Sequence, residues 1–512
     1  MPDIKKMPIA WTIAGSDSGG GAGIQADLAT FRDFGVHGCS VITALTAQNS
    51  FAVGYIEPTS RKALAAQINA LDCDLPARAI KLGMLASASI VESVAKYLAE
   101  YRGFVVCDPV LTSSSGASLL DGDGRKILRE KLLPRVDLLT PNRDEVEALL
   151  ERPLSGLGDV EQAAIDLLAL GVRAVLITGG HFETENNRRL DYFSDGTDSF
   201  WLAGTNIETI HSHGTGCTLS TAIAAGIARG YALPDALVLA KMYVTQGLRN
   251  ALQIGGGPGA VLHLGWPEQF DDFPILSRQL PRQSPRQSPQ ESPQEPTQEL
   301  AVSTALVFPS CDGELGLYPV VDSVEWIERL LPLGVKTIQL RVKDKTAEQL
   351  DAAIAQAVAI SRQHAARLFI NDHWQLAIKH GAYGVHLGQE DLDTADLAAI
   401  AAAGLRLGIS NHSYYELARA HGIQPSYLAL GPIFPTQTKV MKFRDQGIEQ
   451  LSRWAKLLKP GYTLTAIGGI TQERARVVLA AGVGSCAMVS AITQANSYHA
   501  VVQDLLALHQ TG

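Results

Sequence analysis

The sequence has few cysteines, no long apolar run and no excess of positive charge. Its six cysteines are widely spaced and form no Cys-x-x-Cys pair, so neither a disulfide framework nor a zinc site is indicated. This usage is typical of a reducing compartment, and we expect a cytoplasmic protein. Because no run of about 18 apolar residues occurs, we expect no membrane span. The formal net charge of −9 argues against a nucleic-acid partner and against an anionic membrane surface.

Residues 280–299 contain almost no apolar side chains, and they divide the chain. Prolines recur at positions 281, 285, 289 and 293, and Gln, Ser, Arg and Glu fill most of the other positions. Such a segment cannot bury enough surface to fold, and its prolines favour a semi-extended spacer of at most roughly 60 Å. A surface loop and a proline-rich ligand are the alternatives. We predict a domain at 1–270, a linker at 271–300 and a second domain at 301–512.

In the first domain, short β-like runs alternate with helical patterns such as residues 24–34 and 61–71. Alternation of this kind predicts an α/β fold, in which helices cover both faces of a mostly parallel sheet. Ligands of such sheets bind at the carboxyl ends of the strands. The expected strands cover residues 9–14, 40–44, 79–82, 104–107, 136–140 and 174–178.

Two glycine-rich loops follow expected strands. The first, GSDSGGGAGIQAD at 15–27, permits close approach of backbone N–H groups to a ligand, but it matches neither a P-loop nor the GxGxxG pattern. A flexible turn is an equally good interpretation of this loop. The second, HGTGC at 213–217, opens an apolar helix, and Gly214 and Gly216 let the N–H groups of residues 215–218 point at a phosphate. The helix N-terminus would lower the pKa of the Cys217 thiol, unless Cys217 is simply a small buried side chain.

Seven motifs occur in order along this domain: TIAGSDSGGGAGIQADL, VITALTAQNS, KLGML, DPVLTSSSG, LTPNRDE, TGGH and HGTGCTLS. In order and spacing they resemble the hydroxymethylpyrimidine and phosphomethylpyrimidine kinases of the ribokinase-like fold. The resemblance implies an N-terminal ribokinase-like αβα sandwich that uses ATP and Mg²⁺. It covers nearly the whole domain.

The kinase resemblance also implies roles for individual residues. Asp27 and Gln48 would hydrogen-bond the aminopyrimidine, with Gly15 near its ring. Cys217 would occupy the position where most ribokinase-like enzymes keep an aspartate base. Thr178 departs from the pattern, because many members have Lys there, and we expect another cation or Mg²⁺ to compensate. The residues that would form the anion hole or hold ATP and Mg²⁺ are Gly214, Thr215, Gly216, Asn142 and Glu145, the last as a metal ligand.

The second domain repeats a strand–helix pattern eight times, which predicts a compact TIM (β/α)8 barrel. The chemistry of this fold is carried by the carboxyl ends of the strands, and polar residues gather there in the sequence. Asp372 and Asp391, on neighbouring strand ends, are candidate ligands for a hard cation. Arg341, Lys343 and Lys439 supply positive charge for a diphosphate. The expected strands cover residues 317–321, 337–340, 367–370, 384–387, 405–409, 427–430, 463–467 and 485–489.

The stretch LYPVVDSVEWIERLL, residues 428–439, AIGGI and residues 488–494 resemble thiamine-phosphate synthase, and the resemblance covers essentially the whole domain. It implies that diphosphate leaves the pyrimidine methylene carbon and that the thiazole nitrogen then attacks, without a protein nucleophile. It assigns Asp372 and Asp391 to Mg²⁺ and places Ser410 beside the pyrimidine. The residues that it assigns to binding of the pyrimidine diphosphate are Gln339, Arg341, Lys343, Asn371 and Lys439. Those that it assigns to binding of the thiazole phosphate are Thr436, Thr438, Gly469, Val489 and Ser490.

The two resemblances together predict a bifunctional enzyme of thiamine biosynthesis. One half would make the pyrimidine diphosphate by two ATP-dependent phosphorylations, and the other would couple it to thiazole phosphate. Its partners would be these small molecules, and because related folds often form dimers we expect a homo-oligomer. Two alternatives remain open: a broader vitamin kinase that also accepts pyridoxal, and a chain in which one half is a non-enzymatic remnant.

Overall fold

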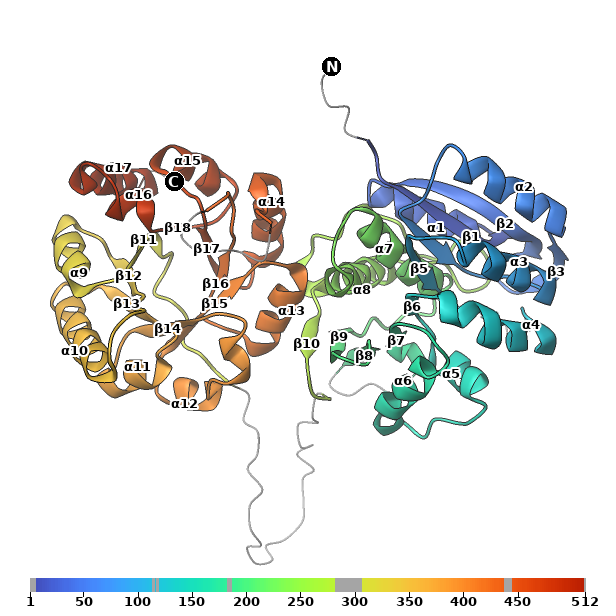
Figure 1. Cartoon of the computed structure of the whole chain (residues 1–512), viewed down its shortest axis with the longest axis horizontal. Helices are drawn as coiled ribbons and strands as arrows, with labels where there is room; N and C mark the ends of the chain where they lie inside the picture. Colours follow the sequence, from blue (N-terminus) through green and yellow to red (C-terminus); the bar gives the residue numbers. More distant parts are fainter. Residues whose placement is uncertain are drawn as a thin grey trace, which may run out of the picture. The chain divides into compact units, whose positions relative to one another are not determined.

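The computed structural model describes residues 6–112, 116, 119–181, 187–280, 306–436 and 444–510. The chain divides into two compact units, Met1–Arg286 and Gln287–Gly512, each of which is described by itself. Figure 1 shows the sheet and helices of the first unit in blue to green and the barrel of the second in yellow to red. Within the described ranges, no helix is both long and apolar enough to cross a bilayer.

The first unit is built on one ten-stranded sheet in the order β10-β9-β8-β7-β6-β5-β4-β1-β2-β3. Its centre, from β2 to β7, is parallel, and the strands outside it pair antiparallel. The predicted mostly parallel sheet is confirmed. The strands are β1 (Ile9–Asp17), β2 (His37–Gln48), β3 (Val53–Pro58), β4 (Ala79–Leu82), β5 (Phe104–Cys107), β6 (Leu138–Leu139), β7 (Val175–Ile177), β8 (Arg188–Ser194), β9 (Ser199–Thr205) and β10 (Ile275–Ser277).

Helices cover both faces of this sheet. Helices α1, α7 and α8 pack together on one face, and α2 to α6 lie on the other (Figure 1). Helix α7 is apolar along nearly its whole length, because it is buried between α1, α8 and the sheet. The helices are α1 (Gly23–Asp33), α2 (Arg61–Asp72), α3 (Ala88–Leu98), α4 (Gly122–Ile127), α5 (Arg143–Leu150), α6 (Val160–Leu168), α7 (Thr215–Ala228) and α8 (Leu233–Arg249).

All six strands expected in the first domain are present, whereas four strands were not expected. Strand β3 is largely exposed and has no apolar run, and β8, β9 and β10 form an antiparallel extension rather than strand–helix units. Strand β10 also lies within 271–300, the segment assigned to the linker. The folded first unit therefore continues beyond residue 270. Residues 281–300 of the predicted linker lie outside the described residues.

The second unit is a closed barrel of eight parallel strands, as predicted. Four of the strands have the bounds that the sequence pattern predicted, and the other four differ by one or two residues at one or both ends. The strands are β11 (Gly316–Val321), β12 (Thr337–Leu340), β13 (Arg367–Asn371), β14 (Gly384–Leu387), β15 (Arg406–Asn411), β16 (Tyr427–Leu430), β17 (Thr463–Ile467) and β18 (Ser485–Met488). The helices are α9 (Val324–Leu330), α10 (Ala347–Gln363), α11 (Trp374–His380), α12 (Leu397–Ala402), α13 (Tyr414–Ile423), α14 (Gly447–Leu458), α15 (Gln472–Ala480), α16 (Ser490–Thr493) and α17 (Tyr498–Gln510).

Aromatic rings fill the inside of the barrel. Tyr318, Phe369 and Tyr427 are buried and pack edge to face, with ring centroids 5.0–6.0 Å apart. Two strand glycines make room for them. A Cβ atom on Gly384 would lie 2.5 Å from the Phe369 ring, and one on Gly408 would lie 2.1 Å from the Tyr427 ring. The interior is therefore a packed core that admits large rings only beside glycine.

Candidate active sites

In the first unit, Asp17 holds the glycine-rich loop. Its buried carboxylate, at the end of β1, accepts N–H groups from Gly19 (2.8 Å), Gly21 (3.1 Å) and Ala22 (2.9 Å). Nε2 of His213 lies 3.2 Å from the same carboxylate. Burial favours the neutral acid, but these hydrogen bonds outweigh it and hold the pKa of Asp17 below its usual value. Three of the backbone N–H groups that we expected to face a ligand therefore donate to Asp17 within the loop.

The two glycine-rich loops of the first unit lie against each other. A Cβ atom on Gly214, whose φ is +83°, would lie 2.0 Å from the carbonyl oxygen of Gly21. A Cβ atom on Gly21 would lie 2.6 Å from the imidazole of His213. Gln48 reaches the same place, with its Nε2 3.3 Å from Nε2 of His213. The structure thus brings Gln48, which was predicted to bind the pyrimidine, next to the HGTGC loop, which was predicted to bind the phosphate.

Beneath these loops lies a buried ion pair between Asp27 and Lys81. Nζ of Lys81 is 2.9 Å from both Asp27 oxygens, and both side chains are fully buried. Thr12 and Thr221 also donate to this carboxylate, at 2.5 and 2.6 Å. The four side chains come from β1, α1, β4 and α7. Both oxygens of the Asp27 carboxylate are therefore hydrogen-bonded within the protein, and Asp27 joins these four elements.

Two further acids, Asp108 and Glu145, lie beside the start of α7. A Cβ atom on Gly216 would lie 3.3 Å from Oδ2 of Asp108. Burial raises the pKa of Asp108 to about 6, and Lys81 limits the rise. Burial and the neighbouring Asp108 raise the pKa of Glu145 to about 8. Two buried carboxyl groups that repel each other fit a site that a cation completes. Asp108 was quoted within a motif but was not predicted as a site residue.

The expectation that helix α7 lowers the pKa of Cys217 is wrong. Burial raises the pKa of this thiol to about 12, and the carboxylates of Asp108 and Asp27 add to the rise, although Lys81 opposes it. A thiol with this pKa is protonated at neutral pH and is a poor base. The structure therefore places Cys217 in the first turn of α7, where the anion hole is predicted, but gives it the properties of a neutral side chain.

Iodoacetamide at pH 8 should modify Cys73 and leave Cys217 unmodified. Cys73 is exposed, whereas Cys217 is partly buried and its raised pKa leaves almost no thiolate to react. Mass spectrometry of tryptic peptides after timed alkylation measures both sites in one sample. Modification of Cys217 at a rate equal to that of Cys73 would contradict this assignment.

Asn142 and Glu145, predicted to order the nucleotide, first serve helix α5. The Asn142 side chain accepts the N–H of Glu145 at 3.0 Å, and the Glu145 carboxylate accepts the N–H of Asn142 at 2.9 Å, which is a capping box. Thr178 lies beside them through an isolated parallel bridge to Asn142. We expected another cation to compensate for the lysine that many family members have at position 178. Lys241 does not do so, because its Nζ is bound to Asp191 at 2.6 Å. Asp191 in turn accepts the N–H of Gly179 at 2.9 Å.

In the barrel, the predicted diphosphate ligands follow β12 from the interior to the surface. Gln339 is buried in the interior, Arg341 is half-buried just past the strand end, and Lys343 is exposed. The predicted Thr438 and Lys439 lie outside the described residues. Thr436, which precedes them, is half-buried. The structure therefore places part of the predicted cationic set at one end of the barrel.

The two predicted metal ligands of the barrel lie near each other. Burial and the charge of Asp391 raise the pKa of Asp372, while Arg341 lowers it. Asp372 also has a φ of +63°, which is uncommon for a residue other than glycine. A hard cation between the two carboxylates would relieve their repulsion, so the donor set fits Mg²⁺. Among the described residues, no cluster of three or more His, Cys, Asp or Glu side chains that could hold a metal is found.

His386 links the barrel interior to the predicted pyrimidine site. Its Nε2 lies 2.8 Å from Oγ of Ser410, and its Nδ1 lies 2.7 Å from the hydroxyl of Tyr427. Burial and, to a smaller extent, the charge of Arg341 lower the pKa of His386 to about 4. The ring is therefore neutral at physiological pH. His386 lies on strand β14 and was not predicted as a site residue.

The predicted phosphate site follows the last two strands. Gly468 and Gly469 have φ values of +100° and +63°, and a Cβ atom on Gly469 would lie 2.6 Å from the carbonyl oxygen of Pro435. Val489 and Ser490 begin α16 directly after β18. These residues come from the carboxyl ends of neighbouring strands, as does Asn371 at the end of β13.

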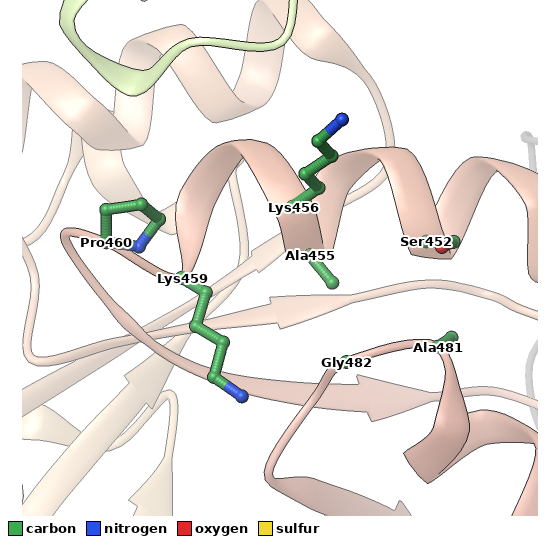
Figure 2. Close-up of a pocket in the computed structure, with 7 residues that line it drawn as sticks. All are labelled: Ser452, Ala455, Lys456, Lys459, Pro460, Ala481 and Gly482. Carbon is green, nitrogen blue, oxygen red and sulfur yellow. The ribbon is translucent and has the colours of Figure 1, made fainter.

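A hollow of about 440 Å³ in the second unit lies at the other end of the barrel. It is formed by the last turn of α14 and the turn at Ala481 and Gly482, which lead into the amino ends of β17 and β18 (Figure 2). Figure 2 shows Lys456 and Lys459 extending away from each other. Because its polar groups do not converge, we do not assign this hollow to the chemistry.

Comparison with known proteins identifies both units. The family model for thiamine monophosphate synthase matches residues 317–492. The chain is 61% identical over 201 residues to thiamine-phosphate synthase of Serratia proteamaculans (strain 568). The aligned residues cover 39% of this chain and 94% of that relative. The chain belongs to the thiamine-phosphate synthase family. The family model for phosphomethylpyrimidine kinase matches residues 17–262, so a kinase domain precedes the synthase domain.

Solved structures resemble the kinase domain in sequence. Phosphomethylpyrimidine kinase from Clostridium difficile 630 is 37% identical, and the match covers 47% of this chain and 98% of that one with a TM-score of 0.42. Pyridoxal kinase of Bacillus subtilis is 33% identical, covering 50% of this chain and 98% of that one with a TM-score of 0.48. The two family matches and the synthase relative show that the chain is a fused, bifunctional enzyme of thiamine biosynthesis with a kinase unit and a synthase unit.

Proposed function

We propose that the kinase unit phosphorylates 4-amino-5-hydroxymethyl-2-methylpyrimidine and then its monophosphate with ATP, and that the synthase unit couples the diphosphate to 4-methyl-5-(2-phosphoethyl)thiazole. The products are thiamine phosphate and pyrophosphate. The observation that carries the proposal is the co-occurrence of both family matches in one chain, each on a unit whose polar residues gather at strand carboxyl ends. The product of the first unit is the substrate of the second.

In the kinase unit, the start of α7 would receive the transferred phosphoryl group. The N–H groups of Gly216 and Cys217 lie in its first turn and are not needed by the helix itself, whereas that of Thr215 donates to the carbonyl of Ser212 at 3.3 Å. Gln48 would orient the pyrimidine from the end of β2. Asp108 and Glu145 would hold Mg²⁺, which supplies charge neutralisation between the phosphates. Since Cys217 is protonated, we propose that it contributes a neutral wall rather than a base.

In the synthase unit, Arg341 and Lys343 would stabilise the charge that develops on the departing diphosphate, together with Lys439. Asp372 and Asp391 would hold Mg²⁺, which supplies further neutralisation of the leaving group. Gln339, Asn371 and Ser410 would orient the pyrimidine, so that the thiazole nitrogen meets its methylene carbon. The thiazole phosphate would be held by Thr436, Thr438, Gly469, Val489 and Ser490.

Product analysis of the whole protein tests the proposal. The protein is incubated with hydroxymethylpyrimidine, thiazole phosphate, ATP and Mg²⁺, and thiamine phosphate is measured by chromatography. We expect the product only when all four are present, and we expect preformed pyrimidine diphosphate to replace hydroxymethylpyrimidine and ATP. Failure of the full mixture with rescue by the diphosphate would contradict the kinase assignment. Failure of both would contradict the synthase assignment.

A further inference from the structure

A continuous hydrogen-bonded chain crosses the interior of the synthase barrel. Nε2 of Gln339 donates to the Tyr318 hydroxyl at 3.1 Å, and the Tyr318 and Tyr427 hydroxyls lie 2.8 Å apart. The Tyr427 hydroxyl lies 2.7 Å from Nδ1 of His386, whose Nε2 lies 2.8 Å from Oγ of Ser410. We call these five residues the interior relay. They come from β12, β11, β16, β14 and β15, and all but Ser410 are buried.

Counting the protons that each group carries shows which group donates and which accepts at every hydrogen bond of the relay. An amide nitrogen can only donate, so the Tyr318 oxygen accepts from Gln339 and its own O–H is left to donate to Tyr427. The O–H of Tyr427 must then donate to Nδ1 of His386. A neutral imidazole that accepts at Nδ1 carries its proton on Nε2 and donates it to Ser410. A doubly protonated ring would leave a tyrosine O–H in the chain without an acceptor.

We propose that Tyr318 and Tyr427 are positioning residues that act through His386 to hold the Ser410 hydroxyl as a hydrogen-bond donor to the substrate. Because Oγ of Ser410 accepts the proton of His386, the serine's own hydrogen is left for a ligand. Such a donor recognises an acceptor atom, and a ring nitrogen of the aminopyrimidine has that character. This identification of the ligand rests on the proposed function, whereas the direction of the relay does not.

The packing of the barrel holds the side chains of the relay in position. The rings of Tyr318 and Tyr427 pack against Phe369 with centroids at 5.8 and 5.0 Å, and the Tyr427 ring occupies the space left by Gly408. Tyr383 also packs against Phe369, at 5.4 Å, but its hydroxyl donates to Asp312 at 3.0 Å and is not part of the relay. Replacement of the Tyr383 hydroxyl therefore offers a matched control for the loss of a relay hydroxyl.

The tautomer of His386 tests the direction of the relay without substrate. Two-dimensional ¹H–¹⁵N NMR of histidine-labelled protein distinguishes a ring protonated at Nε2 from one protonated at Nδ1, and the His386→Gln spectrum assigns the signal. We expect the Nε2–H form in the wild type and in Tyr383→Phe. We expect a mixture of tautomers in Tyr427→Phe, because Nδ1 loses its donor. An Nδ1–H ring in the wild type would overturn the proposal, since Ser410 would then donate to the ring.

Synthase kinetics test the consequence for binding. Tyr427→Phe and Tyr318→Phe should each lower kcat/KM for the pyrimidine diphosphate by about ten- to a hundredfold while leaving KM for the thiazole phosphate unchanged. Tyr383→Phe should change neither. Relay variants that match Tyr383→Phe would overturn the proposal, as would equal losses for both substrates, which would indicate a general structural role. A wild type without synthase activity would contradict the proposed function instead, and the NMR result would still decide the direction of the relay.

Discussion

Lys81→Met should lower the free energy of unfolding of the kinase unit by about 3–5 kcal/mol, because it leaves the charge of Asp27 buried without its cation. Lys81 and Asp27 are both fully buried, and the pair joins strand β4 to helix α1 beneath the phosphate loop. The Asp27 carboxylate raises the pKa of Lys81 despite its burial. The ammonium is therefore charged over the whole range in which the protein is active, and its loss is not compensated by water.

Lys131→Met is the matched control for this substitution. Lys131 also pairs with a carboxylate at 2.8 Å, that of Glu92, but the two side chains are 53% and 42% exposed. Its removal should cost less than about 1 kcal/mol. Hydrogen exchange along a urea series, read by mass spectrometry, measures both variants, and peptides of the synthase unit provide an internal reference. Equal effects of the two substitutions would contradict a special role for the buried pair.

Removing the charge from both Asp27 and Lys81 should restore part of the free energy of unfolding that Lys81→Met loses. In the double variant Asp27→Asn/Lys81→Met both charges of the pair are gone; the asparagine oxygen can accept from one of Thr12 and Thr221, and its NH2 group can donate to the other hydroxyl. We expect the double variant to be more stable than Lys81→Met by about 1 kcal/mol or more. A double variant that loses the sum of the two single effects would show that the pair is not coupled.

Asp372→Asn should reduce thiamine phosphate formation from preformed pyrimidine diphosphate by about a hundredfold or more, because it removes one of two charges that would hold Mg²⁺. Asparagine tolerates the positive φ of this position, so the substitution isolates the loss of charge from backbone strain. The phosphorylation of hydroxymethylpyrimidine by the same chain should be unchanged. Calorimetric titration with Mg²⁺ should show that the affinity of the synthase unit falls along with its activity.

Asp393→Asn provides the control for Asp372→Asn. Asp393 lies in the same 3₁₀ turn as Asp391, but its carboxylate is paired with Arg419. This variant should retain most of the synthase activity and its dependence on Mg²⁺. An Asp372→Asn enzyme with wild-type activity at limiting Mg²⁺ would remove Asp372 from the metal site.

The sequence predicted the barrel of the synthase unit well for a physical reason. Each parallel strand is a short apolar run followed by a helix, and the polar residues past each strand end share one end of the barrel whatever the details of packing. That rule brought Asp372 and Asp391 together in advance. It also placed Gln339 and Arg341 at the end of the second barrel strand, and the structure has Gln339 on β12 and Arg341 directly after it. Family motifs carried the assignment of the chemistry.

The sequence was a weaker guide to the electrostatics of the kinase unit. A position at a helix N-terminus suggested a reactive Cys217, but burial beside Asp108 and Asp27 raises its pKa instead. The family resemblance assigned Asp27 to the aminopyrimidine, and the structure adds an ion pair to Lys81, which lies 54 positions later in the chain. Both outcomes depend on which charges are buried together, and that is a property of the packed sheet and not of any local pattern.

Sequence alone determined that this chain has two α/β units, which families they resemble and which predicted site residues lie at strand ends, because these follow from periodicity and ordered motifs. Only the tertiary structure decided how the side chains are used. It turned the glycine-loop amides toward Asp17 and closed the Asn142–Glu145 capping box. It also joined Gln339 to Ser410 through Tyr318, Tyr427 and His386, since hydrogen bonds between distant residues exist only after the barrel has closed.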